Sequence, residues 1–146
     1  MARFGVPAHV TVLFPFCARD AIDEPTRQVV GQVASSVPAF SARFVEPAAW
    51  PGVVWLRPEP DDSFRALTAA AMERFPDYPP YEGEFADSVP HLTVGQNLDE
   101  EQHRAALEAM TEGLRRRPIA TEVRELVLYM SDDRGHWARR GGWPLR

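Results

Sequence analysis

Two short motifs place a histidine two residues before a threonine within apolar, β-branched sequence. The first reads HVTV and begins at His9, and the second reads HLTV and begins at His91. Their threonines are Thr11 and Thr93. Because the chain has only 4 histidines, two such matches arise by chance in roughly one comparable sequence in a hundred. The pair is therefore a strong signal, whereas one copy would be weak.

The pattern suits acid–base chemistry on a phosphodiester. Side chains alternate along a strand, so the histidine and threonine of each motif share one face. Cleavage needs a base for the attacking oxygen and an acid for the departing one, and imidazole serves as either near neutral pH. We predict His9 and His91 as the catalytic pair, with Thr11 and Thr93 donating hydrogen bonds to phosphoryl oxygens. The alternative is two half-buried histidines that cap strand ends.

The composition excludes several other mechanisms. All 16 basic residues are arginine, so Schiff bases and phosphate-loop lysines are ruled out. Cys17 is the only cysteine, and His103 and His136 lie outside any metal-ligand spacing. We expect no metal and no cofactor.

Two aromatic residues are further candidates for substrate binding. Phe14 follows the first motif and could stack on a base, although core packing is the commoner role of phenylalanine. Tyr81 lies with Tyr78 and Phe85 in a proline-rich loop, residues 76–90, just before the second motif. A stacking or lid role for this loop is balanced against plain surface packing.

One arginine is a candidate phosphate ligand. Arg139 and Arg140 lie in the last expected strand, and we favour Arg139 as the residue that binds substrate. The alternative is an exposed edge strand that charge protects from aggregation.

Apolar periodicity predicts nine elements around the motifs. The expected strands cover residues 8–14, 40–46, 53–57, 91–96, 121–130 and 135–145. The expected helices cover residues 24–37, 63–75 and 100–114, the last beginning with a capping box of Asp99 and Gln102. This order indicates an α+β fold. Each half opens with a motif-bearing strand, so we predict one domain over residues 1–146 with two lobes related by a pseudo-two-fold axis.

Charge and hydropathy limit the substrates and partners that we expect. The net charge is −5, and residues 1–102 carry 7 arginines against 15 acids. Tight binding to long nucleic acid needs a basic surface, so we expect a small substrate. No segment is apolar for the roughly 18 residues of a membrane span, and the N-terminus lacks the apolar stretch of a signal peptide. We therefore expect a cytoplasmic monomer with no membrane partner.

The motifs resemble those of a known superfamily. HVTVLFPF and PHLTVGQ are similar to the 2H phosphoesterases, in particular the bacterial 2'-5' RNA ligase and cyclic phosphodiesterase branch. The closing LVLYMSDDRG and WPL resemble that branch's final strands. The resemblance covers nearly the whole chain. It implies a bilobal fold in which two antiparallel sheets line a central groove, with helices outside.

The resemblance also implies a function. It indicates metal-independent action on 2',3'-cyclic phosphates or 2'-5' linkages of small nucleotides or RNA ends, with His9 and His91 as the catalytic pair and Thr11 and Thr93 holding phosphate. Two alternatives remain open. One is a binding module for nucleotides or RNA ends without turnover, and the other is 2'-5' RNA ligation, the reverse of the same chemistry.

Overall fold

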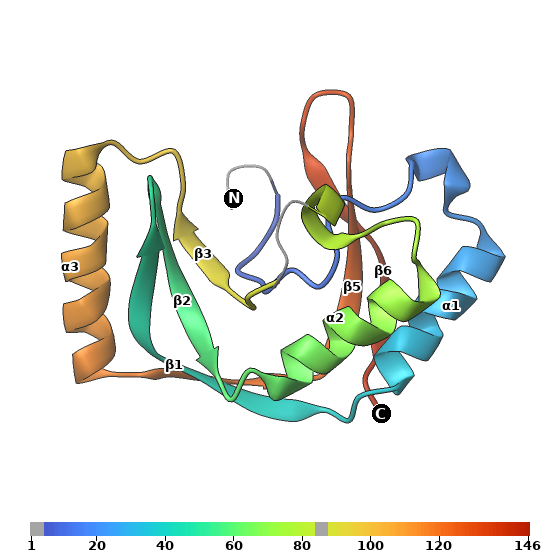
Figure 1. The fold of residues 1–146 in the computed structure, drawn as a ribbon, viewed down its shortest axis with the longest axis horizontal. Coiled ribbons are helices and arrows are strands. Elements are labelled where there is room, and N and C mark those ends of the chain that lie inside the picture. The colour runs from blue at the N-terminus through green and yellow to red at the C-terminus, as the bar shows by residue number, and fades with distance from the viewer. Residues whose placement is uncertain (1–4, 84–87) are drawn as a thin grey trace.

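The computed structural model describes residues 5–83 and 88–146 and has an α+β fold of two antiparallel sheets with helices outside (Figure 1). The helices are α1 (Glu24–Ser35), α2 (Asp62–Arg74) and α3 (Glu100–Arg116). The strands are β1 (Phe40–Trp50), β2 (Val53–Glu59), β3 (Leu92–Gly95), β4 (Ile119–Val123), β5 (Glu125–Ser131) and β6 (Trp137–Pro144). Short turns of 3₁₀ type cover Arg19–Ala21 and Pro80–Gly83.

The strands form two separate sheets. Four of them pair in the order β3-β2-β1-β4, and β5 and β6 form a hairpin of their own. Helix α3 covers one face of the four-stranded sheet, while α1 and α2 pack together on the side of the β5–β6 hairpin (Figure 1). The N-terminal segment that carries the first motif passes between β3 and this hairpin (Figure 1).

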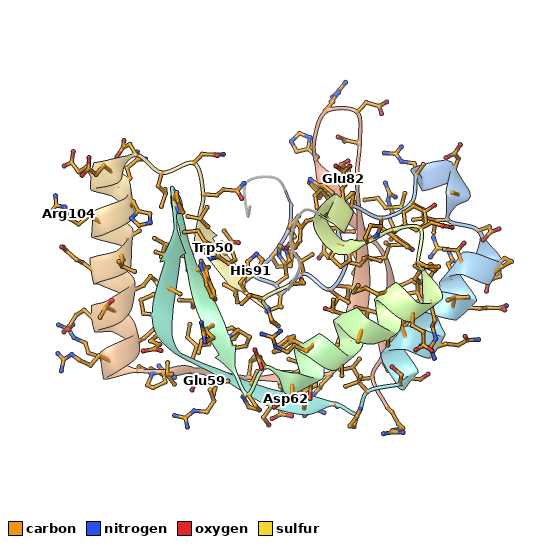
Figure 2. All side chains as sticks on the ribbon, viewed as in Figure 1. Trp50, Glu59, Asp62, Glu82, His91 and Arg104 are labelled. Atoms are coloured by element: carbon orange, nitrogen blue, oxygen red, sulfur yellow. The ribbon has the colours of Figure 1, made fainter. Side chains whose placement is uncertain are left out.

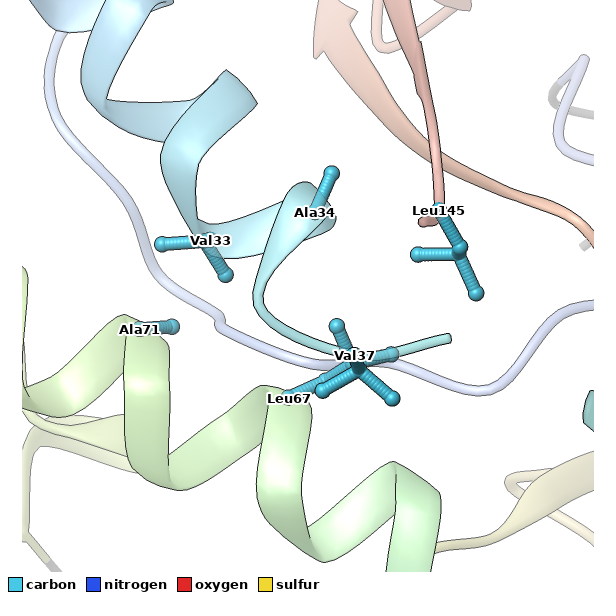
Figure 3. Packing of buried hydrophobic residues seen from close by; sticks show 6 residues of the cluster. All are labelled: Val33, Ala34, Val37, Leu67, Ala71 and Leu145. Carbon is cyan, nitrogen blue, oxygen red and sulfur yellow. The ribbon is translucent and has the colours of Figure 1, made fainter. Parts of the chain in front are cut away.

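The apolar core has two parts, one beside each sheet. The first, here the helix cluster, joins α1 and α2 to the C-terminal end of the chain (Figure 3). Its buried members are Val33, Ala34, Val37, Leu67, Ala71 and Leu145. The second, here the sheet cluster, lies between the four-stranded sheet and α3. Its buried members are Phe44, Leu56 and Leu114.

Local sequence explains the helix boundaries. Asp99 accepts a hydrogen bond from the backbone N–H of Gln102, whose side chain accepts one from the Asp99 N–H, so the predicted capping box is confirmed. Asp23 caps α1 through the Thr26 N–H. Asp61 precedes α2 but makes no such cap, and its carboxylate instead accepts a hydrogen bond from Arg65.

The prediction of a strand over residues 8–14 is wrong, because this segment joins neither sheet. Its backbone oxygens are bound outside any strand ladder. The Phe14 carbonyl accepts a hydrogen bond from the Tyr81 N–H at 2.7 Å, and the Val12 carbonyl accepts one from the Thr68 hydroxyl at 3.3 Å. β-branched composition supports extended backbone, but a strand also needs a neighbouring strand with which to pair.

The predicted long strand over residues 121–130 is two strands in different sheets. β4 pairs with β1, and β5 pairs with β6, with Arg124 as the one residue between them. The Arg124 carbonyl accepts a hydrogen bond from the Leu145 N–H, outside the ladder of either strand. β1 in turn is longer than expected, since a register shift between Phe44 and Pro47 lets it run through the proline.

Leu56 should be a sensitive position for stability. It is 1% exposed in the sheet cluster, so Leu56→Ala should lower the free energy of unfolding by about 2–5 kcal/mol through lost burial and a residual cavity. Chemical denaturation with a fixed m-value measures this change. Met72→Ala on the exposed face of α2 is the control and should change stability by less than about 1 kcal/mol. Equal effects of the two substitutions would contradict the position of the core.

Candidate active site

The second HxT motif lies on the face of the four-stranded sheet that is opposite α3. In the β2–β3 register, Leu56 pairs with Leu92 and Trp55 pairs with Thr93. Leu56 is a buried member of the sheet cluster under α3, and Leu92 packs against that cluster. Directly paired residues point to the same side of a sheet and neighbours along a strand alternate, so Trp55 and Thr93 lie on the opposite side. This side is here called the inner face.

The first motif reaches the same cluster without being part of the sheet. Val10, one residue after His9, packs on the sheet cluster together with Leu92, one residue after His91. Val12 packs on the helix cluster instead. The HVTV segment thus bridges the two parts of the core, and the two motifs meet on one set of apolar side chains.

The two histidines make the same hydrogen bond. Nδ1 of His9 lies 2.8 Å from the carbonyl oxygen of Pro7, and Nδ1 of His91 lies 2.8 Å from that of Val89. A carbonyl only accepts, so Nδ1 of each neutral ring carries the proton and donates it. Nε2 then holds the lone pair and is the nitrogen that is available to accept a proton. The same local contact thus fixes both rings in the same tautomer.

Aromatic rings surround His91. The Trp50 ring centroid lies 4.9 Å from the imidazole centroid with the planes at 77°, and that of Trp55 lies 6.0 Å away at 72°. Tyr81 is near parallel to the imidazole, at 28° and 6.4 Å. Figure 2 shows His91 next to Trp50, which is the last residue of β1. These contacts restrict the rotation of His91 and give one side of the site a flat apolar wall.

Tyr81 reaches this position through an unusual turn. Tyr81 and Glu82 have φ angles of 53° and 56°, in the left-handed region that residues other than glycine seldom adopt. Burial raises the pKa of the Tyr81 hydroxyl above its ordinary value, so the phenol stays protonated at neutral pH and can donate a hydrogen bond. The structure thus brings Tyr81 to the second motif, and its backbone bond to Phe14 ties it to the first.

The remaining predicted residues, Phe14 and Arg139, make their contacts with the β5–β6 hairpin. Phe14 is 48% exposed, and its ring lies 6.2 Å from that of Trp137 on β6. The Arg139 guanidinium forms a two-pronged ion pair with Glu125, at 3.1 and 2.7 Å. A phosphate contact by Arg139 stays a prediction and would require this pair to open. Of the loop aromatics, Tyr78 packs on Phe16, whereas Phe85 lies outside the described residues.

Sequence reasoning missed Trp50, at the end of β1, and the inner face of β2. Trp50, Trp55 and Arg57 carry no motif, yet Trp55 and Trp50 contact His91, and the Arg57 guanidinium carbon lies 5.9 Å from the Trp55 ring centroid. The spacing of Trp55 and Arg57 in VVWLR does predict a shared face. Nothing in the local pattern says that β2 lies next to the HLTV strand.

Neither a cluster of metal ligands nor a membrane-spanning helix is present within the described residues. Within residues 5–83 and 88–146, no three His, Cys, Asp or Glu side chains gather where they could hold a metal ion. In those ranges no helix is both long and apolar enough to cross a membrane.

The α+β fold of two antiparallel sheets and the paired HxT motifs are those of the 2H phosphoesterase superfamily. The family model described as the 2'-5' RNA ligase superfamily matches residues 2–135, so the chain belongs to that superfamily and the resemblance read from the motifs is confirmed. Its fold is similar to that of Escherichia coli LigT in apo form, with a TM-score of 0.61 and 19% identity over 94% of this chain and 76% of LigT. A comparison of the sequence with curated proteins found no match.

The hydrogen bonds of the histidines predict their tautomers. At a pH where the rings are neutral, His9 and His91 should both carry the proton on Nδ1. His103 is an internal control, because its Nε2 faces the Trp50 carbonyl at 3.2 Å and should carry the proton instead. Nitrogen-15 correlation spectra of the ring nitrogens distinguish the two forms. A proton on Nε2 in either motif histidine would contradict the proposed proton-exchanging nitrogen.

Proposed function

We propose that the protein is a metal-independent phosphodiesterase that acts on 2',3'-cyclic phosphates or 2'-5' linkages of small nucleotides or RNA ends. The observation that carries the proposal is the matched pair of imidazoles. Each donates from Nδ1 to a carbonyl two residues earlier, and the residues that follow them, Val10 and Leu92, share one core cluster. Membership of the 2'-5' RNA ligase superfamily supports the same class of reaction.

The proposed reaction is an in-line displacement at phosphorus. Nε2 of one histidine takes a proton from the attacking water, whose oxygen bonds to phosphorus. The bond from phosphorus to the leaving ribose oxygen breaks, and Nε2 of the other histidine, in its protonated form, gives that oxygen a proton. Hydroxyls of Thr11 and Thr93 donate hydrogen bonds to the phosphoryl oxygens as negative charge builds on them. Either histidine can take either role.

Aromatic side chains are the proposed contacts for the nucleoside. Trp50 is 39% exposed beside His91, and Tyr81 stacks near the same imidazole. Phe14 is exposed two residues after the first motif. Stacking on such rings is worth about 1–3 kcal/mol per base and is tolerant of base identity. The expected enzyme therefore discriminates poorly between bases.

The same site would catalyse ligation if the attacking group were a ribose hydroxyl and the leaving group the cyclic phosphate's own oxygen. A binding module without turnover is the other candidate. The intact HxT pair and its matched tautomers favour the enzyme, because binding alone does not require a free Nε2 on both rings. A cytoplasmic location belongs to the same proposal and is supported by the single cysteine.

Replacing either catalytic histidine should nearly abolish turnover. His9→Ala or His91→Ala should lower kcat on a 2',3'-cyclic mononucleotide by about 10²–10⁴-fold, since a positioned acid or base contributes that much. The double variant should lose far less than the product, because the two act as a unit. His136→Ala, at the exposed turn before β6, is the control and should retain activity.

Chelators test the metal-free part of the proposal. Turnover should be unchanged after dialysis against EDTA, since both proton transfers are assigned to imidazoles. Loss of activity with EDTA and its return with a divalent ion would overturn that part.

The enzyme should prefer a mononucleotide-sized or short oligonucleotide substrate. Because residues 1–102 have 15 acids against 7 arginines, an extended track for phosphates is not expected, and kcat/KM should depend weakly on salt. A cyclic mononucleotide can be compared with a twenty-mer RNA that bears the same terminal cyclic phosphate, across a salt series. A large advantage of the long RNA that collapses with added salt would contradict the prediction.

A further inference from the structure

Arg57 lies on the inner face, in line with the catalytic motif. It follows Trp55 by two residues on β2, and Trp55 is the register partner of Thr93. The Arg57 guanidinium carbon lies 5.9 Å from the Trp55 ring centroid, and this same ring lies 6.0 Å from the His91 imidazole. The contact confirms that the Arg57 side chain points to the face that carries Trp55, Thr93 and His91.

Arg57 is exposed, and no described residue neutralises its charge. Within residues 5–83 and 88–146 it makes no ion pair, and Glu59, two residues further along the strand, is not joined to it. Arg139 differs in this respect, since its guanidinium is bound by Glu125. Arg57 is thus an exposed cation beside the candidate site, in a part of the chain, residues 1–102, where acids outnumber arginines. Such a cation is suited to bind an anionic group of the substrate.

The Trp55 ring fixes where that group would lie. Trp55 is only 3% exposed, it packs on Trp50 at 4.6 Å, and its indole N–H has no acceptor among the described residues. It is therefore a rigid ring that both His91 and Arg57 lie against. Arg57 lies two residues, or about 6.6 Å, along β2 from Trp55, the register partner of Thr93. The position that it faces therefore neighbours the one at Thr93, and in a nucleotide an anionic group at that position is a neighbouring phosphate.

We propose that Arg57 binds a second phosphate of the substrate, next to the one that is cleaved. The inference rests on the proposed function and narrows its substrate class to nucleotides that carry at least two phosphate groups, such as a 2'-5' dinucleotide with a terminal phosphate. Arg57 is a specificity-determining residue in this account, since the proton transfers belong to the histidines. The planar guanidinium forms paired hydrogen bonds to phosphate, and stacking on Trp55 holds its plane.

The test compares three 2'-5' dinucleotides. One has only the linking phosphate, and the other two add a phosphate at the 5' end or at the 3' end. The wild-type enzyme should prefer one phosphorylated form. Arg57→Ala should lower kcat/KM for that form by roughly ten- to hundredfold, as expected for charge-assisted hydrogen bonds, and leave the unphosphorylated substrate within about threefold. Arg57→Lys should fall between, because it keeps the charge and loses the planar fork.

Arg104→Ala is the matched control. Arg104 is an exposed arginine on the outer side of α3, far from His91 in Figure 2, and its loss should change all three substrates equally little. The proposal is overturned if the wild-type enzyme prefers neither phosphorylated form, or if Arg57→Ala lowers kcat/KM for all three substrates by the same factor.

Calorimetric binding of the same dinucleotides separates this inference from the proposed function. If no substrate were cleaved but the terminal phosphate tightened binding in an Arg57-dependent manner, the phosphate site would be supported and the catalytic proposal would fail. If cleavage depended on His9 and His91 while terminal phosphates changed neither binding nor rate, the reverse would hold.

Discussion

The burial of two aliphatic side chains on one apolar cluster is the constraint on which the candidate site depends. Val10 and Leu92 both pack on Phe44, Leu56 and Leu114, under α3. Each is the middle residue of its HxT motif, so burying it fixes the backbone on either side of it. For Leu92 the strand alternation then directs Thr93 away from α3. The same short sequence therefore supplies both a residue that packs on the core and the candidate site residues on either side of it.

The two histidines are oriented by local contacts rather than by partners from elsewhere in the fold. A carbonyl two residues earlier holds Nδ1 in both motifs, which leaves Nε2 for proton transfer. The other contacts of the two histidines differ. His91 lies against Trp50, Trp55 and Tyr81. The backbone carbonyls of the segment that follows His9 instead accept hydrogen bonds from the Tyr81 N–H and the Thr68 hydroxyl. The two histidines thus share one local contact but have different neighbours, and in the proposed enzyme this difference would distinguish the two sides of a substrate.

Much of this could be predicted from the sequence, because the signals are local. Helical periodicity, the capping box at Asp99 and the HxT spacing each involve residues within a few positions of one another. The failures are non-local. The β-branched segment with the first motif lacks a pairing partner, and the break at Arg124 depends on two strands joining different sheets. Trp50 and Arg57 were missed for the same reason, since only the pairing of β1 with β2 and of β2 with β3 brings their strands next to the second motif.

The central claim is that His9 and His91 act on one phosphate. Its most direct measurement is an NMR titration of the imidazole signals of both histidines with a nucleoside 2'-monophosphate, a product of the proposed reaction. The account predicts that the Nε2 signals of both residues shift together, with one dissociation constant and one ligand bound per chain, while those of His136 stay in place. Shifts of only one motif histidine, or separate dissociation constants for the two, would contradict it.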